Sequence, residues 1–139
     1  MNTENNKIIV KHFVDAHNRQ DLKKLGELLA PDFKAHLTGM DQPLNREGYL
    51  QGVRIAHQAF SNLIFTIQDL IAEGEKVVAK IQAQGKHTGE YMGIKPTGNL
   101  VKFDGIIIRR IVDGKVIEEC QTDDHLSLLR QIGEMPKGL

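Results

Sequence analysis

The sequence predicts an α+β fold, with helices packed on one face of a curved, mixed or antiparallel sheet. In the first half of the chain apolar residues recur at helical spacing, and in the second half they alternate with polar residues. The pair Asp113-Gly114 lies between two runs rich in β-branched residues. It suits a two-residue hairpin, because both central positions of such a turn need a positive φ.

Three helices are expected in the N-terminal half and a short one at the C-terminal end. Thr3, Asp21 and Asn45 precede the apolar patterns and are predicted to cap the first three helices. Gly133 is predicted to end the last helix. This organisation favours one domain over residues 1–139.

The hairpin determines which side chains share a face. With Asp113-Gly114 at the centre of the turn, Arg109 is predicted to face Glu118. A one-residue bulge would exchange Arg109 for Arg110 on this face. Without a bulge, one face carries a stripe that ends in a carboxylate: Phe103, Ile107, Arg109, Glu118, Cys120, Thr122 and Asp124.

Composition excludes several classes of protein. The chain has 139 residues, 26% of them charged, with a formal net charge of zero, so nucleic acid is not an expected partner. No apolar run has the length of a membrane span, and the N-terminus is polar where a secretory signal would be apolar. The single cysteine, Cys120, excludes an internal disulfide and fits a reducing compartment. We therefore expect a cytoplasmic protein.

Several short motifs occur in the order typical of one family. The most informative are Asn18-Arg19-Gln20-Asp21, Ala30-Pro31-Asp32-Phe33, Asn45-Arg46-Glu47-Gly48, Gly93-Ile94-Lys95-Pro96-Thr97-Gly98 and Leu128-Leu129-Arg130-Gln131-Ile132-Gly133. With them the chain resembles the SnoaL-like polyketide cyclases, a branch of the nuclear transport factor 2-like superfamily.

The resemblance implies a cone-shaped cavity between helices and sheet, in a homodimer. It also implies ring closure by intramolecular aldol condensation without a metal or organic cofactor, with an aspartate near the end of the last strand as acid and base. Asp124 is the matching residue here. Three positions depart from the family pattern: Cys120 replaces a tryptophan, Ile107 a polar or acidic residue, and Arg109 an aromatic residue or histidine.

Three residues are candidates for the chemistry. Asp124 could remove a proton α to a carbonyl if the cavity is dry; the alternative is that it caps the last helix, a role we assign to Asp123. Arg109 could hold an enolate or a carboxylate through its planar guanidinium, although an ion pair with Glu118 is slightly favoured. His36 could donate to a substrate oxygen, or be a surface or core histidine.

Further side chains are candidates for the cavity wall. They are Phe33, Tyr49, Phe60, Phe103, Ile107, Cys120 and Thr122. Aromatic residues at such positions can equally form plain core. No histidine pair or cysteine cluster has metal-ligand spacing, so no metal site is predicted.

The predicted function is a cofactor-independent cyclase or isomerase acting on a small carbonyl or polyketide-type substrate. The main alternative is a non-catalytic module that binds a small molecule in the same cavity. An enzyme of the epoxide-hydrolase or ketosteroid-isomerase type is a third possibility on the same fold.

Overall fold

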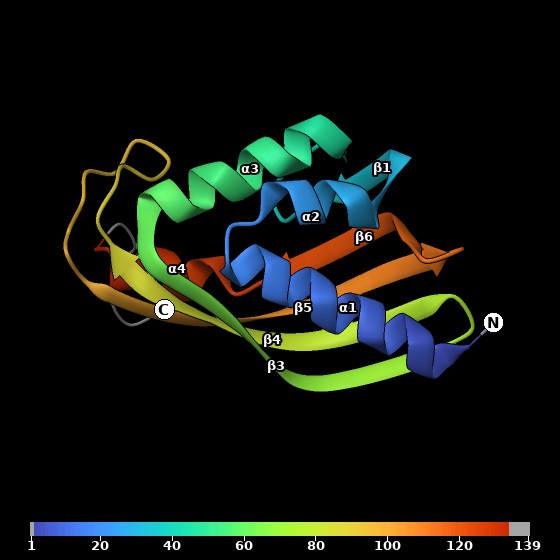
Figure 1. Cartoon of the computed structure of the whole chain (residues 1–139). Helices are drawn as coiled ribbons and strands as arrows, with labels where there is room; N and C mark the ends of the chain where they lie inside the picture. Colours follow the sequence, from blue (N-terminus) through green and yellow to red (C-terminus); the bar gives the residue numbers. More distant parts are fainter. Residues whose placement is uncertain (1, 134–139) are drawn as a thin grey trace.

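A computed structural model describes residues 2–133 of the chain (Figure 1). Helices occupy most of the N-terminal half and long strands most of the remainder. The elements are α1 (Thr3–Asn18), α2 (Leu22–Leu28), β1 (Leu29–His36), β2 (Leu44–Asn45), α3 (Arg46–Ala59), β3 (Phe60–Glu73), β4 (Lys76–His87), β5 (Leu100–Val112), β6 (Lys115–Asp123) and α4 (His125–Gln131).

The strands of residues 2–133 form one sheet in the order β2-β1-β6-β5-β4-β3. β1 runs parallel to β6 and the other neighbours are antiparallel. The helices α1, α2 and α3 lie on one side of this curved sheet, and α4 follows β6 at one end (Figure 1). The predicted α+β class is confirmed. No helix among the described residues is both long enough and apolar enough to cross a membrane.

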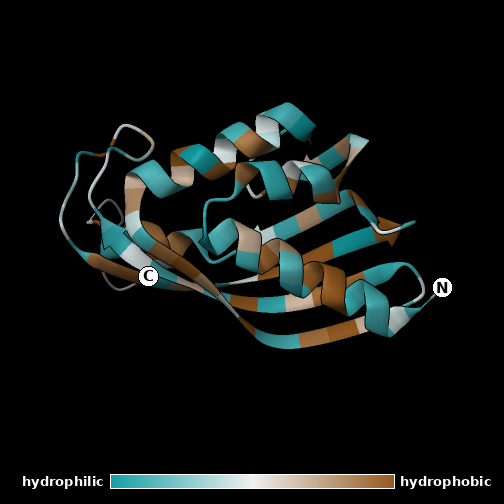
Figure 2. Cartoon of the chain, viewed as in Figure 1, coloured by the Kyte–Doolittle hydropathy of each residue, from teal (hydrophilic) through white to brown (hydrophobic). Residues whose placement is uncertain are grey.

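The core lies between the helices and the inner face of the sheet, and hydrophobic positions recur along α1 and the strands (Figure 2). Val10 and Phe13 of α1 are completely buried in the larger of two apolar clusters. The smaller cluster joins the end of α3 to α4 through Phe60 and Leu128. Burial of this apolar surface holds the helices over the sheet.

Of the N-caps predicted for α1, α2 and α3, two are correct. The side chain of Asp21 accepts a hydrogen bond from Lys24 N, and that of Asn45 accepts one from Gly48 N. The prediction for Thr3 is wrong, because Asn2 caps α1 and Thr3 is its first helical residue.

The hairpin turn is as predicted, but the pairing beyond it is not. Asp113 and Gly114 have φ values of 51° and 77°, and Val112 pairs with Lys115. The register then shifts, so that Arg110 rather than Arg109 pairs with Glu118. Strand β6 therefore contains one extra residue, Ile117, as a bulge. Beyond this bulge each side chain of β6 points to the face opposite to the one expected from regular pairing.

Candidate active site

The bulge decides which residues of β6 face the helices. Beyond it Glu119 pairs with Arg109 and Asp123 with Gly105, all on the inner face. Cys120 and Thr122 are exposed on the outer face and do not line the cavity. The prediction that they share a face with Arg109 is wrong, because a shift of one residue exchanges the two faces of a strand.

A cavity of about 460 Å³ lies between α3, β3 and the inner face of the sheet. Of the residues predicted for its wall, Tyr49, Phe60 and Phe103 do line it. Ile107 lines a much smaller adjoining cavity, and Phe33 lies in the core with its ring centroid 5.2 Å from that of Tyr49. A mainly apolar wall with a few polar groups is typical of a site for a small organic molecule.

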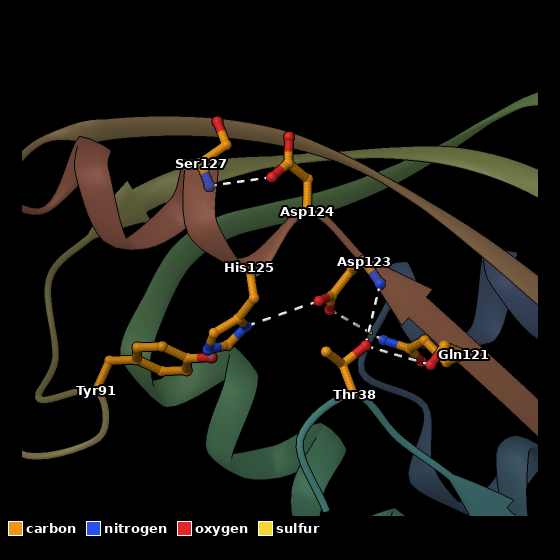
Figure 3. A network of polar contacts seen from close by, with 7 residues as sticks. All are labelled: Thr38, Tyr91, Gln121, Asp123, Asp124, His125 and Ser127. Atoms are coloured by element: carbon orange, nitrogen blue, oxygen red, sulfur yellow. Dashed lines mark hydrogen bonds and ion pairs between the residues drawn. The ribbon is translucent and has the colours of Figure 1, made fainter. Parts of the chain in front are cut away.

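Polar residues gather at the end of β6, where they form what we call the Asp123 network: Thr38, Tyr91, Gln121, Asp123 and His125 (Figure 3). All of them line the cavity. Thr38 fixes the backbone of β6, because its hydroxyl donates to Gln121 O (3.3 Å) and accepts from Asp123 N (3.1 Å). The strand therefore ends in a defined position beside the cavity.

The Asp123 carboxylate is largely enclosed, with 16% of its side chain exposed. Its Oδ2 accepts a hydrogen bond from Gln121 Nε2 at 3.3 Å. Its Oδ1 has no hydrogen-bond partner among the described residues and lies 3.6 Å from His125 Nδ1, which is too long for a hydrogen bond. One carboxylate oxygen is therefore enclosed without a hydrogen-bond partner among the described residues.

Two neighbours shape the surroundings of this carboxylate. His125 Nε2 lies 3.4 Å from the hydroxyl of Tyr91, so the imidazole sits between that phenol and Asp123 (Figure 3). Burial, together with the negative charge of Asp123, raises the pKa of Tyr91 to about 12, so the phenol stays protonated at neutral pH. Gly105 faces Asp123 across the hairpin, and a Cβ there would come within 3.2 Å of Asp123 Cβ.

Asp124 does not face the cavity. It is exposed, and its Oδ1 accepts a hydrogen bond from Ser127 N at 3.1 Å as the N-cap of α4 (Figure 3). The positions predicted for the two aspartates are therefore reversed: Asp124 caps α4 and Asp123 lines the cavity. The physical reason is the bulge, which moves the inward positions of β6 from even to odd numbers.

Arg109 is buried, but its partner is not the predicted Glu118. Its Nε donates to Glu119 Oε1 at 2.9 Å, Tyr49 donates to the same oxygen at 3.2 Å, and the guanidinium lies 4.5 Å above the ring of Phe13. Burial alone would lower the pKa of Arg109, but Glu119 and Tyr49 outweigh it and raise that pKa above its usual value. The pKa of Tyr49 is raised above its usual value, mainly by burial and next by the charge of Glu119. This compensated cluster supports the fold beneath the cavity.

His36 also lies away from the cavity. Its side chain is 46% exposed, and its Nε2 is 3.5 Å from Glu118 Oε2 on the outer face of the sheet. The cavity wall does not include it, so its predicted contact with substrate is not supported by its position.

His17 also lines the cavity, beside His57, and neither was predicted for the site. His17 lies in the last turn of α1 and His57 belongs to α3; their ring centroids are 5.2 Å apart. Burial is the main reason that the pKa of His17 falls to about 3, and the charges of His57 and Arg109 lower it further. Burial likewise lowers the pKa of His57. Both imidazoles are therefore neutral at physiological pH.

Sequence reasoning also missed Tyr91, Gln121 and His125. Gln121 and His125 can be recognised only when it is known that the odd-numbered residues of β6 beyond the bulge face the cavity. Tyr91 lies in the segment between β4 and β5, which is punctuated by Gly and Pro, and loops of this kind often carry binding residues. Among the described residues, no three histidine, cysteine or acidic side chains come together as a metal site requires.

The helices, the curved sheet and the apolar cavity with polar groups at one end define an α+β protein built to enclose a small organic molecule. The chain belongs to the SnoaL-like polyketide cyclase family, whose model matches residues 7–132. The prediction made from the sequence motifs is confirmed.

Three relatives and neighbours illustrate the membership. The aklanonic acid methyl ester cyclase DauD of Streptomyces sp. (strain C5) is 30% identical over 132 residues, which cover 91% of this chain and 80% of that protein. The nogalonic acid methyl ester cyclase of Streptomyces nogalater is 25% identical, over 87% of this chain and 92% of that protein. The aklanonic acid methyl ester cyclase DnrD of Streptomyces peucetius is 28% identical, over 78% of this chain and 65% of that protein.

Solved structures agree with this fold. IdmH from Streptomyces antibioticus, a proposed polyketide cyclase, is 31% identical, with a TM-score of 0.84 over 92% of this chain and 98% of its own. AclR from Streptomyces galilaeus, a proposed hydroxylase, superimposes with a TM-score of 0.89 at 27% identity, over 98% of this chain and 89% of its own. The fold therefore serves proteins assigned to different chemistries.

Proposed function

We propose that the protein is a cofactor-independent cyclase that closes a ring in a polyketide-type carbonyl compound, with Asp123 as the acid and base. The observation that carries this proposal is the enclosed Asp123 carboxylate, which lines the cavity and has one oxygen without a hydrogen-bond partner among the described residues. A carboxylate at the wall of a mainly apolar cavity is placed where it can exchange a proton with a bound carbonyl compound.

The proposed reaction is an intramolecular aldol addition. Asp123 takes a proton from a carbon α to one carbonyl, and the resulting enolate carbon attacks a second carbonyl carbon of the same molecule. The new carbon–carbon bond forms as the second C=O becomes an alkoxide, which takes the proton back from the Asp123 carboxyl. The product is an isomer of the substrate, so neither an oxidant nor a reductant is needed.

The neighbours of Asp123 have supporting roles in this scheme. Gln121 donates to Oδ2 at 3.3 Å and so fixes the orientation of the carboxylate. Tyr91 keeps its proton, since its pKa is about 12, and its hydroxyl can donate to an oxygen that becomes negative. His125 lies between the two and can orient either group.

The relatives suggest the class of substrate. They are cyclases of aklanonic acid methyl ester and nogalonic acid methyl ester, and the mainly apolar cavity of about 460 Å³ is compatible with flat, ring-containing molecules. We therefore propose a polyketide ester or a related ketone as the substrate.

The test compares Asp123→Asn with Asp124→Asn. Aklanonic acid methyl ester and nogalonic acid methyl ester serve as probes, with ring closure followed by chromatography and α-proton exchange followed by NMR in D₂O. Asp123→Asn is expected to lower both rates by about 10²- to 10⁴-fold, the usual contribution of a positioned base. Asp124→Asn is the matched control, because asparagine caps a helix as well as aspartate does.

Two other results would redirect the assignment. Equal rates for the wild type and Asp123→Asn would remove Asp123 from the chemistry. Tight binding of the probes by a wild type that neither exchanges protons nor closes the ring would favour the non-catalytic binding module.

We further propose a cytoplasmic homodimer that pairs through the outer face of the sheet. Support comes from large apolar side chains exposed on the sheet strands: Ile64, Ile71, Ile106 and Ile108. The lone cysteine fits a reducing compartment. Light scattering should give twice the chain mass for the wild type and a monomer for Ile106→Glu; a monomeric wild type would contradict the dimer.

A further inference from the structure

His17 lies in the last turn of α1 and packs on Phe65 of β3, whereas Asp123 lies on β6, and two strands, β5 and β4, separate β6 from β3 in the sheet. His17 lines both the main cavity and the small adjoining one of about 20 Å³. Its neighbour Asn18 pairs with the backbone of Phe65 through two hydrogen bonds of 2.8 and 2.9 Å. The ring of His17 meets that of Phe65 edge-on at 4.5 Å. The imidazole is therefore held in one place on the wall.

The hydrogen bonds of His57 assign the tautomer of His17. His57 Nε2 lies 2.9 Å from His17 O, and a carbonyl oxygen can only accept, so His57 Nε2 carries a proton. The same nitrogen lies 3.3 Å from His17 Nδ1, where a second proton would be repelled. His17 Nδ1 is thus the bare nitrogen, and the proton of this neutral imidazole is on Nε2.

Few polar groups compete for this proton. No hydrogen bond reaches His17 Nε2 from any of residues 2–133. The small cavity is lined mostly by apolar side chains, with Arg109 and Tyr49 as its other polar residues. Tyr49 already donates to Glu119, and Arg109 is a donor whose Nη1 has no partner among the described residues. This end of the cavity therefore offers donors rather than acceptors.

We propose that His17 binds a carbonyl oxygen of the substrate through its Nε2–H, so that the substrate carries an acceptor oxygen remote from the carbon that Asp123 deprotonates. This inference rests on the proposed function for its choice of occupant, and it names a substrate feature that the Asp123 network does not require. A neutral donor suits a ketone, whereas a free carboxylate or phosphate would gain no opposite charge from His17 itself.

A matched pair of probes tests the acceptor directly. 9-Fluorenone and fluorene have nearly the same flat shape, but only fluorenone has a carbonyl oxygen. Calorimetry or fluorescence titration should show fluorenone binding the wild type about two- to tenfold more tightly than fluorene, the net effect of one hydrogen bond. In His17→Phe, which keeps an aromatic ring beside Phe65, this preference should disappear or reverse.

Two control variants separate this inference from the proposed function. His12→Phe makes the same change at an exposed position of α1 and should keep the preference for fluorenone. Asp123→Asn should also keep it, whatever that variant does to catalysis. Equal binding of the two probes by the wild type, a preference that survives in His17→Phe, or no binding of either probe would overturn the role of His17 and leave the cyclase assay to decide the proposed function.

If His17→Phe does not fold, the same inference can be tested by NMR on the wild type. Fluorenone labelled with ¹³C at its carbonyl should show a downfield carbonyl shift on binding, as hydrogen-bonded carbonyls do. The ¹⁵N spectrum should show His17 protonated at Nε2 alone and that resonance moving with fluorenone but not with fluorene. A proton on Nδ1, or an unmoved Nε2 resonance, would overturn the inference.

Discussion

Strand β6 turns two carboxylates inward, four residues apart, and they differ in their charged partners and in their contact with the cavity. Glu119 is completely buried and is paired with Arg109 at 2.9 Å and Tyr49 at 3.2 Å. Asp123 is also largely enclosed, but among the described residues its ion-pair partner is His125, at 3.6 Å. Asp123 lines the main cavity, and Glu119 does not.

The difference explains why the two acids can have different roles. Glu119 is paired with the buried guanidinium of Arg109 and accepts from Tyr49, so it serves the fold. Asp123 faces the imidazole of His125 instead of a guanidinium, and it lines the cavity. The same strand thus supplies a structural acid at one position and a candidate catalytic acid at another.

The largest effect on stability is expected from breaking the compensated pair. Arg109→Met leaves Glu119 buried without its cation, which should lower the free energy of unfolding by about 3–5 kcal/mol. Chemical denaturation measures this change. The matched control is Arg110→Met, because Arg110 is 40% exposed and pairs with Glu75 at 3.4 Å on the outer face. An exposed pair contributes about 1 kcal/mol or less.

A double variant sharpens the test of compensation. Arg109→Met combined with Glu119→Gln removes both charges and should recover part of the lost stability, since the penalty comes mainly from an unpaired buried charge. If Arg109→Met and Arg110→Met cost the same, or if the double variant is the less stable, Glu119 is not held by compensation and the contrast with Asp123 fails.

The sequence predicted the fold class and the hairpin turn because both depend on strong local signals. Asp113-Gly114 needs two positive φ values, and the structure has them. The caps at Asp21 and Asn45 are equally local, since a side chain accepts from a backbone three residues away. The positions of Tyr49, Phe60 and Phe103 in the cavity wall were predicted correctly, because the inward face of a single helix or strand follows from its periodicity.

The site itself could not be predicted, because it depends on one bulge. After Lys115, β6 continues with Val116-Ile117-Glu118-Glu119, two apolar residues and then two glutamates. A shift of one residue leaves this pattern almost unchanged, so alternation cannot detect it. The bulge nevertheless exchanges Asp124 for Asp123 at the cavity. Contacts between distant segments, such as His17 with His57, have no local signal at all.

The smallest predicted effect concerns His17, a buried group that lies beside the charge of Arg109 without an anion of its own. Its pKa is about 3 in the folded protein and about 6.5 when unfolded, so the unfolded chain takes up the proton first as the pH falls. Stability should therefore be full above the unfolded value and decline through it, by about 2 kcal/mol between pH 7 and pH 5. Urea denaturation at both pH values measures the decline, which His17→Phe should remove in large part and His12→Phe should not. Equal pH dependence in all three proteins would mean that His17 is not held neutral by its surroundings.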